Sequence, residues 1–273
     1  MHESSSEPVN GLQWFGKELE AELRHAGKSQ SELAEAIGYQ QPYVSKVKHG
    51  HAMPSEYFAE SCDRFFDTSG SFARLRTRIS RRGHPEWFVP YLELEERASR
   101  IRYFTPFLVT GLLQTWSYAE ALYRSWSPCD SDETIREKVT ARMSRQVIRD
   151  RPSPPLLWVV LDESCLHRMV GDRAAMRGQM EHLMTVAQTP HVTLQILPYD
   201  SGAPAAGEGY TLLSFDDPAQ DPVLYAEVLG EGYVIDSAAT VATGADGYER
   251  LCADALSPEK SLRVLREAIK EFA

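Results

Sequence analysis

The sequence contains no apolar run close to the roughly 20 residues that a membrane-spanning helix needs. Residues 1–7 (MHESSSE) also lack the basic and then apolar order that is typical of a signal peptide. These two absences exclude the usual sequence signals for membrane insertion and for export. We therefore expect a cytoplasmic protein without a membrane partner.

Closely spaced cysteines and histidines are also missing. The four cysteines, Cys62, Cys129, Cys165 and Cys252, lie far apart, unlike the close pairs that bind zinc or the dense sets of disulfide frameworks. We interpret them as buried, reduced thiols and not as redox groups. The eight histidines are scattered along the chain, and none form a pair at metal-ligand spacing, so we predict no metal site.

Motifs of enzyme chemistry are missing as well. The sequence has no glycine-rich phosphate loop and no nucleophile elbow, and the glycines in the range 202–209 have no Lys or Arg beside them. Asp162 and Glu163 follow an apolar run, where catalytic carboxylates can occur, but Glu163 could equally cap the next helix. We expect no catalytic residue and no cofactor. The alternative is a DNA-tethered enzyme, which a deep pocket presenting these carboxylates and a histidine would favour.

A net basic charge, which favours nucleic-acid binding, is absent from the chain as a whole, since 29 Lys and Arg stand against 39 Asp and Glu. The acidic excess is confined to one part. Residues 1–82 contain 11 residues of each sign, so the remaining chain holds 18 basic and 28 acidic residues. A length of 273 residues exceeds the usual ~100–200 of one domain. We predict two domains, of which the second is acidic; one large domain is the alternative.

The first part of the chain shows helical periodicity. Residues 1–12 offer little apolar surface, and we predict a flexible tail there. From Trp14 onward apolar residues recur every three or four positions, which predicts three short helices with tight turns between them and one or two closing helices. The stripes of the three helices comprise Phe15, Leu19, Leu23, Leu33, Ala34, Ile37, Val44 and Val47. We assign a helix-turn-helix domain to residues 13–70.

The second and third helices have clear end signals. Ser29 and Glu32 form a capping-box pattern, and Gly38 can take the positive φ that a tight turn requires. Pro42 lies in the first turn of the third helix, where proline is tolerated. Ala34 is small enough to let two helices cross steeply. Such a pair can place the third helix in the major groove of DNA.

The polar edge of the third helix supplies the predicted DNA contacts. Its N-terminal residues face base edges in this geometry, and their neighbours position the phosphate backbone or support the base-reading side chains. We assign base readout to Gln40, Gln41, Tyr43 and Lys46. The other predicted DNA-binding residues are Lys28, Gln30, Ser45, Lys48, His49 and His51. The alternative is a helical hairpin that only packs and leaves its polar face solvated.

The segment from Trp14 to about Phe66 resembles the xenobiotic-response-element, or phage-repressor-like, family of helix-turn-helix domains. The resemblance rests on Gln30, Leu33, Ala34, Gly38, Val44, Ser45 and Gly50. It implies an all-α domain that binds double-stranded operator DNA. Pro42 departs from the family pattern, because it removes one N–H donor from the start of the third helix.

Arginines dominate the segment that follows this domain. There is no acidic residue between Thr68 and Pro85. The arginines in the range 74–82 are Arg74, Arg76, Arg78, Arg81 and Arg82. We interpret residues 71–87 as a basic linker whose arginines either contact phosphate or solvate the linker.

Residues 88–273 are predicted to form a mixed α/β domain. Helical patterns cover 88–103, 114–125 and 133–149, and two more helices are expected around Met176–Ala187 and from Ser257 onward. Apolar runs of strand length occupy 156–161, 192–197, 210–215 and 223–229. The predicted fold class is therefore α+β: an all-α helix-turn-helix bundle followed by a mixed α/β domain with a small sheet.

Several segments of this second part resemble the antitoxin-like C-terminal domain DUF5753, which follows such a DNA-binding module in many actinobacterial regulators. The segments are Glu95, 110–115 (TGLLQT), 118–119 (YA), 142–146 (RMSRQ), 161–163 (LDE), 197–198 (LP) and 255–261 (ALSPEKS). The resemblance implies a small, separately encoded partner protein.

Together these observations predict a sequence-specific transcription regulator. One helix-turn-helix contacts a half-site, so we expect a homodimer on a two-fold symmetric operator. The acidic domain would hold the dimer together and sense a partner protein or a ligand. The alternative is an antitoxin-like adaptor that sequesters a small partner protein and regulates its own promoter.

Overall fold

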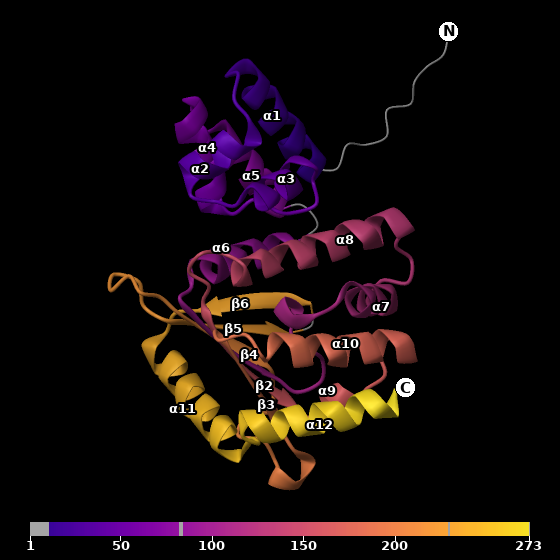
Figure 1. Cartoon of the computed structure of the whole chain (residues 1–273). Coiled ribbons are helices and arrows are strands. Elements are labelled where there is room, and N and C mark those ends of the chain that lie inside the picture. The colour runs from indigo at the N-terminus through magenta and orange to yellow at the C-terminus, as the bar shows by residue number, and fades with distance from the viewer. Residues whose placement is uncertain (1–10, 82–83, 229, 273) are drawn as a thin grey trace. The chain divides into compact units, whose positions relative to one another are not determined.

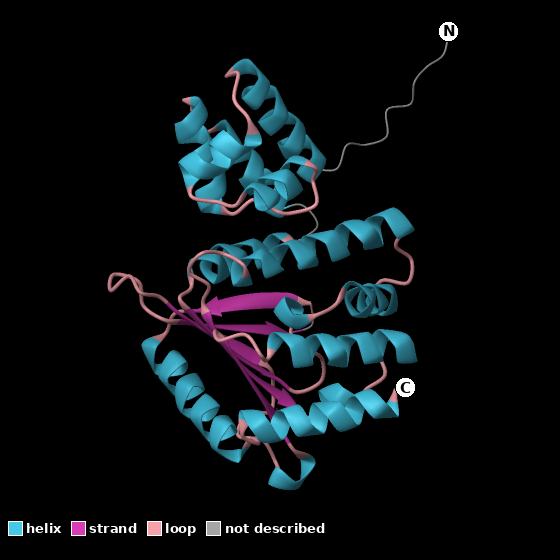
Figure 2. Cartoon of the chain, in the orientation of Figure 1, coloured by secondary structure: helices cyan, strands magenta, loops and turns pink. Residues whose placement is uncertain are grey.

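The computed structural model describes residues 11–81, 84–228 and 230–272. Most of the predicted tail, residues 1–10, lies outside the described residues, while Gly11 and Leu12 begin the first helix. The chain divides into two compact units, Met1–Gly83 and His84–Ala273. The first unit is helical and the second combines helices with a sheet, which confirms the predicted α+β class (Figure 2).

The described part of the N-terminal unit contains five helices. They are α1 (Gly11–His25), α2 (Gln30–Ile37), α3 (Gln41–Lys48), α4 (Glu56–Phe66) and α5 (Ser71–Arg81) (Figure 1). The predicted apolar stripes meet in one core, where Phe15, Leu33 and Val44 are fully buried. The stripes of short helices thus provide the stability that each helix alone lacks.

The ends of α2 and α3 follow the predicted signals. The Ser29 side chain accepts a hydrogen bond from the Glu32 N–H, and the Glu32 carboxylate accepts one from the Ser29 N–H, which completes the capping box. Gly38 ends α2 with φ at +75°. Pro42 lies in the first turn of α3, and α3 ends at Lys48, two residues before Gly50.

A helix occupies most of the segment that we interpreted as a basic linker. The Asp63 carboxylate accepts hydrogen bonds from the Phe72 and Ala73 N–H groups and so caps the start of α5. Phe72 is fully buried in the core of the unit, and Leu75 and Ile79 pack against the same core. This apolar stripe was not predicted, because arginines lie between its residues in the sequence. The domain boundaries themselves stay a prediction.

The C-terminal unit has a six-stranded sheet in the order β3-β2-β1-β4-β5-β6. The strands are β1 (Arg100–Thr105), β2 (Leu156–Asp162), β3 (Val192–Leu197), β4 (Tyr210–Ser214), β5 (Val223–Val228) and β6 (Glu231–Ile235). The first three strands are parallel, and the last three are joined antiparallel. The sheet is larger than the predicted small sheet, because β1 and β6 were not predicted.

Helices cover both faces of this sheet (Figure 1). The helices described in this unit are, in chain order, η1 (Glu86–Phe88), α6 (Val89–Arg97), η2 (Gly111–Leu113), α7 (Trp116–Trp126), α8 (Asp132–Ser144), η3 (Arg145–Arg149), α9 (Ser164–His167), α10 (Arg173–Val186), η4 (Tyr199–Ser201), α11 (Ala238–Asp254) and α12 (Pro258–Glu271). The first face packs on the main core with α6, α7, α10 and α12. The second face packs on α11.

A glycine lies where α11 packs closely on the sheet. A Cβ atom at Gly244 would lie 2.5 Å from Leu224 Cδ1. The Tyr210 hydroxyl donates to the Gly244 carbonyl at 2.8 Å. This helix was not predicted, since glycine and β-branched residues have low intrinsic helix propensity.

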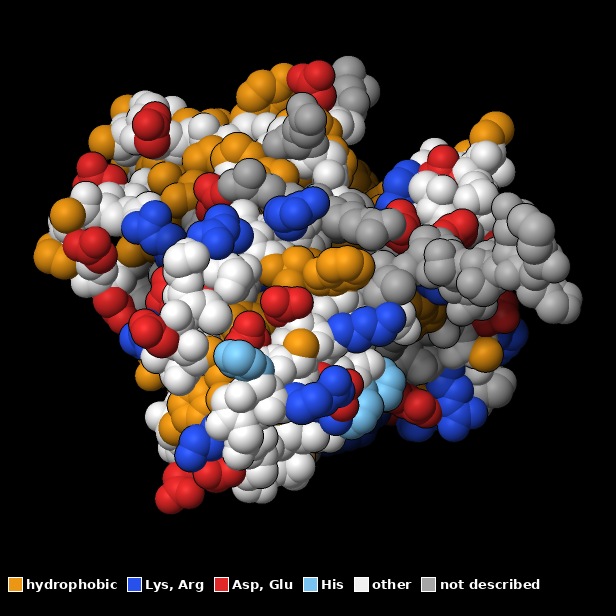
Figure 3. Space-filling view, turned by 90° about the horizontal axis from the view of Figure 1, so that it is seen from above, with side chains coloured by type: hydrophobic (Ala, Val, Ile, Leu, Met, Phe, Trp, Pro, Cys, Tyr) orange, Lys and Arg blue, Asp and Glu red, His pale blue; other side chains and the backbone are white. Residues whose placement is uncertain are grey.

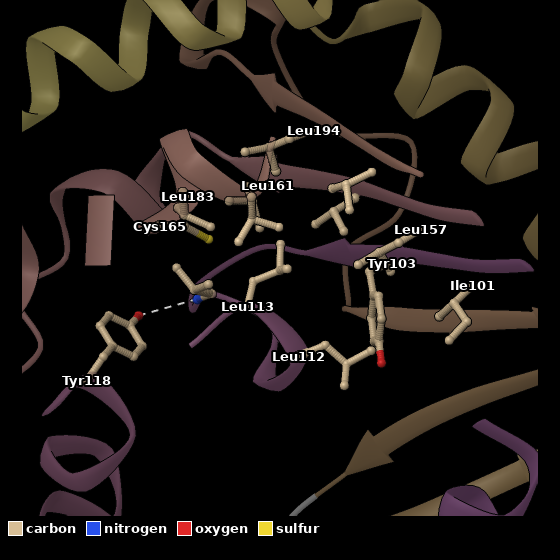
Figure 4. Packing of buried hydrophobic residues seen from close by; sticks show 14 of the residues in the cluster. Ile101, Tyr103, Leu112, Leu113, Tyr118, Leu157, Leu161, Cys165, Leu183 and Leu194 are labelled. Atoms are coloured by element: carbon tan, nitrogen blue, oxygen red, sulfur yellow. Dashed lines mark hydrogen bonds between the residues drawn. The ribbon is translucent and has the colours of Figure 1, made fainter. Parts of the chain in front are cut away.

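The segment 110–115 (TGLLQT) is buried in the main core. Leu112 and Leu113 point among side chains from β1 and β2 (Figure 4). The fully buried Gln179 of α10 donates to the Leu113 carbonyl at 2.7 Å and accepts from the Thr115 N–H at 2.8 Å. Gln179 therefore satisfies the backbone of this buried loop, and the segment 110–115 contributes Leu112 and Leu113 to the core.

A buried ion pair joins α6 to η3. Arg145 donates to both Glu95 carboxylate oxygens, at 2.8 and 3.0 Å, and Glu95 is 2% exposed. The hydroxyls of Tyr91 and Tyr103 each donate to Glu95 at 2.6 Å. Burial raises the pKa of the Glu95 carboxyl, but Arg145 and these hydrogen bonds outweigh it, so this pKa lies below its ordinary value.

Candidate nucleic-acid interface

The third helix presents one buried and one exposed edge. Val44 is fully buried and Val47 is 1% exposed, as predicted. Gln40, Gln41 and Lys46 are exposed. This arrangement leaves the polar edge of α3 open to solvent along its first two turns, where a groove-binding helix needs base-reading side chains.

Two glutamines connect α2 to this edge. The Gln41 amide nitrogen lies 3.4 Å from the Gln30 side-chain oxygen, within hydrogen-bonding reach. Gln30 is the first residue of α2 and is half-buried, so it is the more constrained partner. The contact restricts the rotamers of Gln41, and it supports the interpretation that Gln30 orients a base-reading side chain.

Tyr43 is partly buried, and its side chain contacts the rest of the unit. Its hydroxyl donates to the Met53 carbonyl at 3.2 Å and accepts from the Ser55 N–H at 3.3 Å. Its ring stacks on Tyr39 with centroids 5.0 Å apart, and burial raises the pKa of its phenol. These contacts tie α3 to the segment before α4, whereas Gln41 and Lys46 are exposed.

The remaining predicted contacts surround α3 and are partly engaged with the protein. Lys28 pairs with Glu32 at 3.0 Å, and Lys48, which is mostly buried, pairs with Glu20 at 3.3 Å. His49 Nδ1 lies 2.8 Å from the carbonyl oxygen of Ser45. The rings of His49 and His51 are stacked at 6.2 Å, and both histidines are exposed.

The electrostatic case for DNA rests on the local sequence. Residues 36–55 contain no Asp or Glu, although they include α3 and the turn after it. On the face drawn in Figure 3, Lys and Arg side chains lie among Asp and Glu side chains. The absence of carboxylates from this segment removes local repulsion between the protein and phosphate.

Sequence reasoning missed the residues that position the edge. Lys48 donates a hydrogen bond to Glu20, and the Tyr43 hydroxyl bonds to the backbone of Met53 and Ser55. These partners come from other parts of the chain and meet the predicted residues only in the folded unit. No periodicity or motif signals such contacts, because two of them use backbone atoms.

Family comparisons agree with this geometry. A helix-turn-helix family model matches residues 19–72, and the model described as Domain of unknown function (DUF5753) matches residues 88–267. The chain belongs to the DUF5753 family. No curated protein and no solved structure matches it. The helix-turn-helix match identifies the N-terminal unit as that of a DNA-binding transcription regulator.

The predicted carboxylates of the DUF5753 domain lie at the carboxyl ends of β2 and β3. The Asp162 carboxylate accepts from the Ser164 N–H at 2.9 Å, and the Glu163 carboxylate accepts from the Tyr199 N–H at 2.8 Å. His167 Nε2 is 3.7 Å from Glu163, beyond hydrogen-bonding distance. These groups hold loops at the sheet edge, so the arrangement does not favour the enzyme alternative.

The cysteines are not all buried. Cys62 and Cys165 are buried, and burial raises the pKa of the Cys165 thiol to about 12. Cys129 is exposed, contrary to our interpretation of the four thiols as buried.

Among the described residues of the DUF5753 protein, no helix is long and apolar enough to cross a membrane.

Proposed function

We propose that the protein binds a two-fold symmetric operator as a homodimer and regulates transcription from it. The exposed edge of α3, with Gln41 oriented by Gln30, is the observation that carries the proposal. Gln40 and Gln41 can each bridge the N6 and N7 positions of adenine, and Lys46 suits the O6 and N7 acceptors of guanine. Lys28, Ser45, Lys48, His49 and His51 are assigned to the phosphate backbone.

In this proposal the DUF5753 domain holds the dimer together and senses a partner protein or a ligand. Its acidic balance, 28 acidic against 18 basic residues after residue 82, repels DNA and so confines binding to the N-terminal unit. The N-terminal unit alone reaches one half-site, and two-fold pairing supplies the second.

A genome-wide binding profile tests the proposal. We expect occupied sites to share an inverted repeat with half-site centres about 10 base pairs, or a multiple of this, apart. Occupancy without a shared sequence motif would contradict sequence-specific regulation. Occupancy of the protein's own promoter alone would favour the adaptor that autoregulates.

A further inference from the structure

The second face of the sheet carries two arginines without an acidic partner. Ile101 and Tyr103 of β1 point into the main core, so the alternation of a strand places Arg100 and Arg102 on the opposite face. Within the described residues neither arginine side chain makes a hydrogen bond or an ion pair, and Nε of Arg102 is buried without a partner. Buried guanidinium donors normally have a partner, so the Nε of Arg102 lacks a hydrogen bond that it would be expected to make.

Two apolar side chains stand beside these arginines on the same face. β1 and β2 pair in parallel, with Arg100 opposite Leu156 and Arg102 opposite Trp158. Leu156 is 52% exposed and Trp158 is 39% exposed. The Trp158 indole N–H donates to the Gln195 side chain at 2.8 Å, which fixes the orientation of the ring. We call these four residues the Arg-Trp corner.

Helix α11 covers part of this face (Figure 1) but leaves Arg100, Leu156 and Trp158 exposed. Tyr248 of α11 reaches its border, where the hydroxyl donates to the Trp158 carbonyl at 2.8 Å. The Arg102 guanidinium carbon lies 5.8 Å from the centre of the Tyr248 ring. A guanidinium over an aromatic ring keeps its in-plane N–H groups available for a carboxylate.

We propose that the Arg-Trp corner binds an acidic segment of a partner protein. Carboxylates of that segment pair with Arg100 and Arg102, and an adjacent apolar side chain packs on Leu156 and Trp158. The local charge supports this occupant, because within the described residues the side chains of Arg100 and Arg102 have no acidic partner of their own. Arginine and tryptophan are also the residues that dominate binding energy at protein interfaces.

Other occupants fit the corner less well. Duplex DNA carries a negative charge at every phosphate, so the net negative charge of the domain repels it more strongly than it repels a short acidic segment. A small ligand needs a concave pocket, whereas Leu156 and Trp158 are exposed on a strand face. A second copy of the same corner would set arginines against arginines, because a two-fold contact brings one patch against itself.

The test measures binding of the full-length protein to a fluorescent peptide that alternates glutamate and leucine. The same peptide with glutamine in place of glutamate is the neutral control. We expect affinity for the acidic peptide to fall about tenfold or more in Arg100→Glu and in Arg102→Gln, because charge-assisted hydrogen bonds are lost. Arg266→Glu changes the charge by the same amount as Arg100→Glu, at an exposed position of α12. It should bind the acidic peptide like the wild type.

Arg100 is exposed, so the result for Arg100→Glu stands even if Arg102→Gln disturbs the packing near Tyr248. Three results would overturn the proposal. They are equal affinity of Arg100→Glu and the wild type for the acidic peptide, equal affinity of the wild type for the acidic and the neutral peptide, and no binding of the acidic peptide by the wild type at about 1 mM. The proposal extends the partner-binding part of the proposed function. Operator affinity, measured in the same variants, should not change, and a loss in Arg100→Glu would assign the corner to DNA instead.

Discussion

Gly16 of α1 lies directly against the backbone of α3: a Cβ atom at position 16 would lie 2.0 Å from the carbonyl oxygen of Lys48. Only glycine permits this approach, because no L side chain fits in the space. The contact sets the distance between α1 and the C-terminal end of α3. It thereby fixes how the exposed edge of α3 stands relative to the rest of the unit.

Replacing Gly16 with alanine should therefore destabilise the N-terminal unit by about 1–3 kcal/mol, since a methyl group must displace the backbone. Urea unfolding of the full chain, followed by circular dichroism, measures the effect. Gly178→Ala is the control, because a Cβ atom there meets nothing within 4 Å and the position is inside helix α10. The control should stabilise its own unit by about 0.5–1 kcal/mol. Equal behaviour of the two variants would refute the close contact.

Tyr43→Phe should lower DNA affinity without changing sequence preference. The variant keeps the ring stack on Tyr39 but loses the hydrogen bonds to Met53 and Ser55. Each lost hydrogen bond lowers the stability of the folded unit by about 1 kcal/mol, so α3 is held less firmly in the position that binds DNA. Binding measured on the operator and on a set of single-base variants separates the two effects. If the order of preference among those variants changes, Tyr43 reads bases and our account of its position is wrong.

Glu95→Gln should destabilise the C-terminal unit by about 3 kcal/mol, because it leaves the Arg145 guanidinium buried without a counter-charge. Glu267→Gln on α12 removes a carboxylate from an exposed pair with Lys270 and should change stability by less than about 0.5 kcal/mol. Both values come from urea unfolding at pH 7. Similar losses in the two variants would mean that the buried pair adds nothing beyond a surface pair.

The same carboxyl predicts a dependence on pH. Its pKa in the folded protein is lower than its ordinary value of 4.5, so folding favours the charged form. The stabilisation is fully present above pH 4.5 and is lost as the pH falls through the lower folded pKa. Wild-type stability should hence decrease more steeply with acid than that of Glu95→Gln, as measured by thermal unfolding between about pH 6 and pH 3. Parallel curves would contradict the assignment.

Lys48→Ala should weaken binding to all DNA sequences alike and reduce the slope of log affinity against log salt by about 1, because one phosphate contact is lost. The charge-matched control is Lys260→Ala, an exposed lysine in the first turn of α12. Titrations at several salt concentrations give both slopes. An unchanged slope for Lys48→Ala would show that its pair with Glu20 keeps it from phosphate.

Local signals were enough to predict the helices of the candidate interface. Ser29, Glu32 and Gly38 act within a few residues of their own positions, so the ends of α2 follow from the sequence. Strand β3 is bounded as predicted, because its apolar run ends at Pro198. In both places the residues that end the element lie next to it in the sequence.

Tertiary relationships could not be predicted in this way. Strand β1 was assigned to a helix, because no glycine or proline separates it from α6 and its arginines alternate with core residues. Tyr43 was placed on the DNA side because its partners, Met53 and Ser55, become neighbours only after α4 packs on α3. The position of Arg100 and Arg102 beside Leu156 and Trp158 likewise depends on the register of β1 and β2, which could not be predicted from either strand alone.

The affinity of Gln41→Ala for an operator recovered from the genome-wide profile tests the central claim most directly. Our account predicts a loss of about 1–3 kcal/mol in binding free energy, with an unfolding midpoint equal to that of the wild type. Lys46→Ala should show a loss of the same order on the same operator. Unchanged affinity in both variants would contradict the claim that the exposed edge of α3 reads DNA.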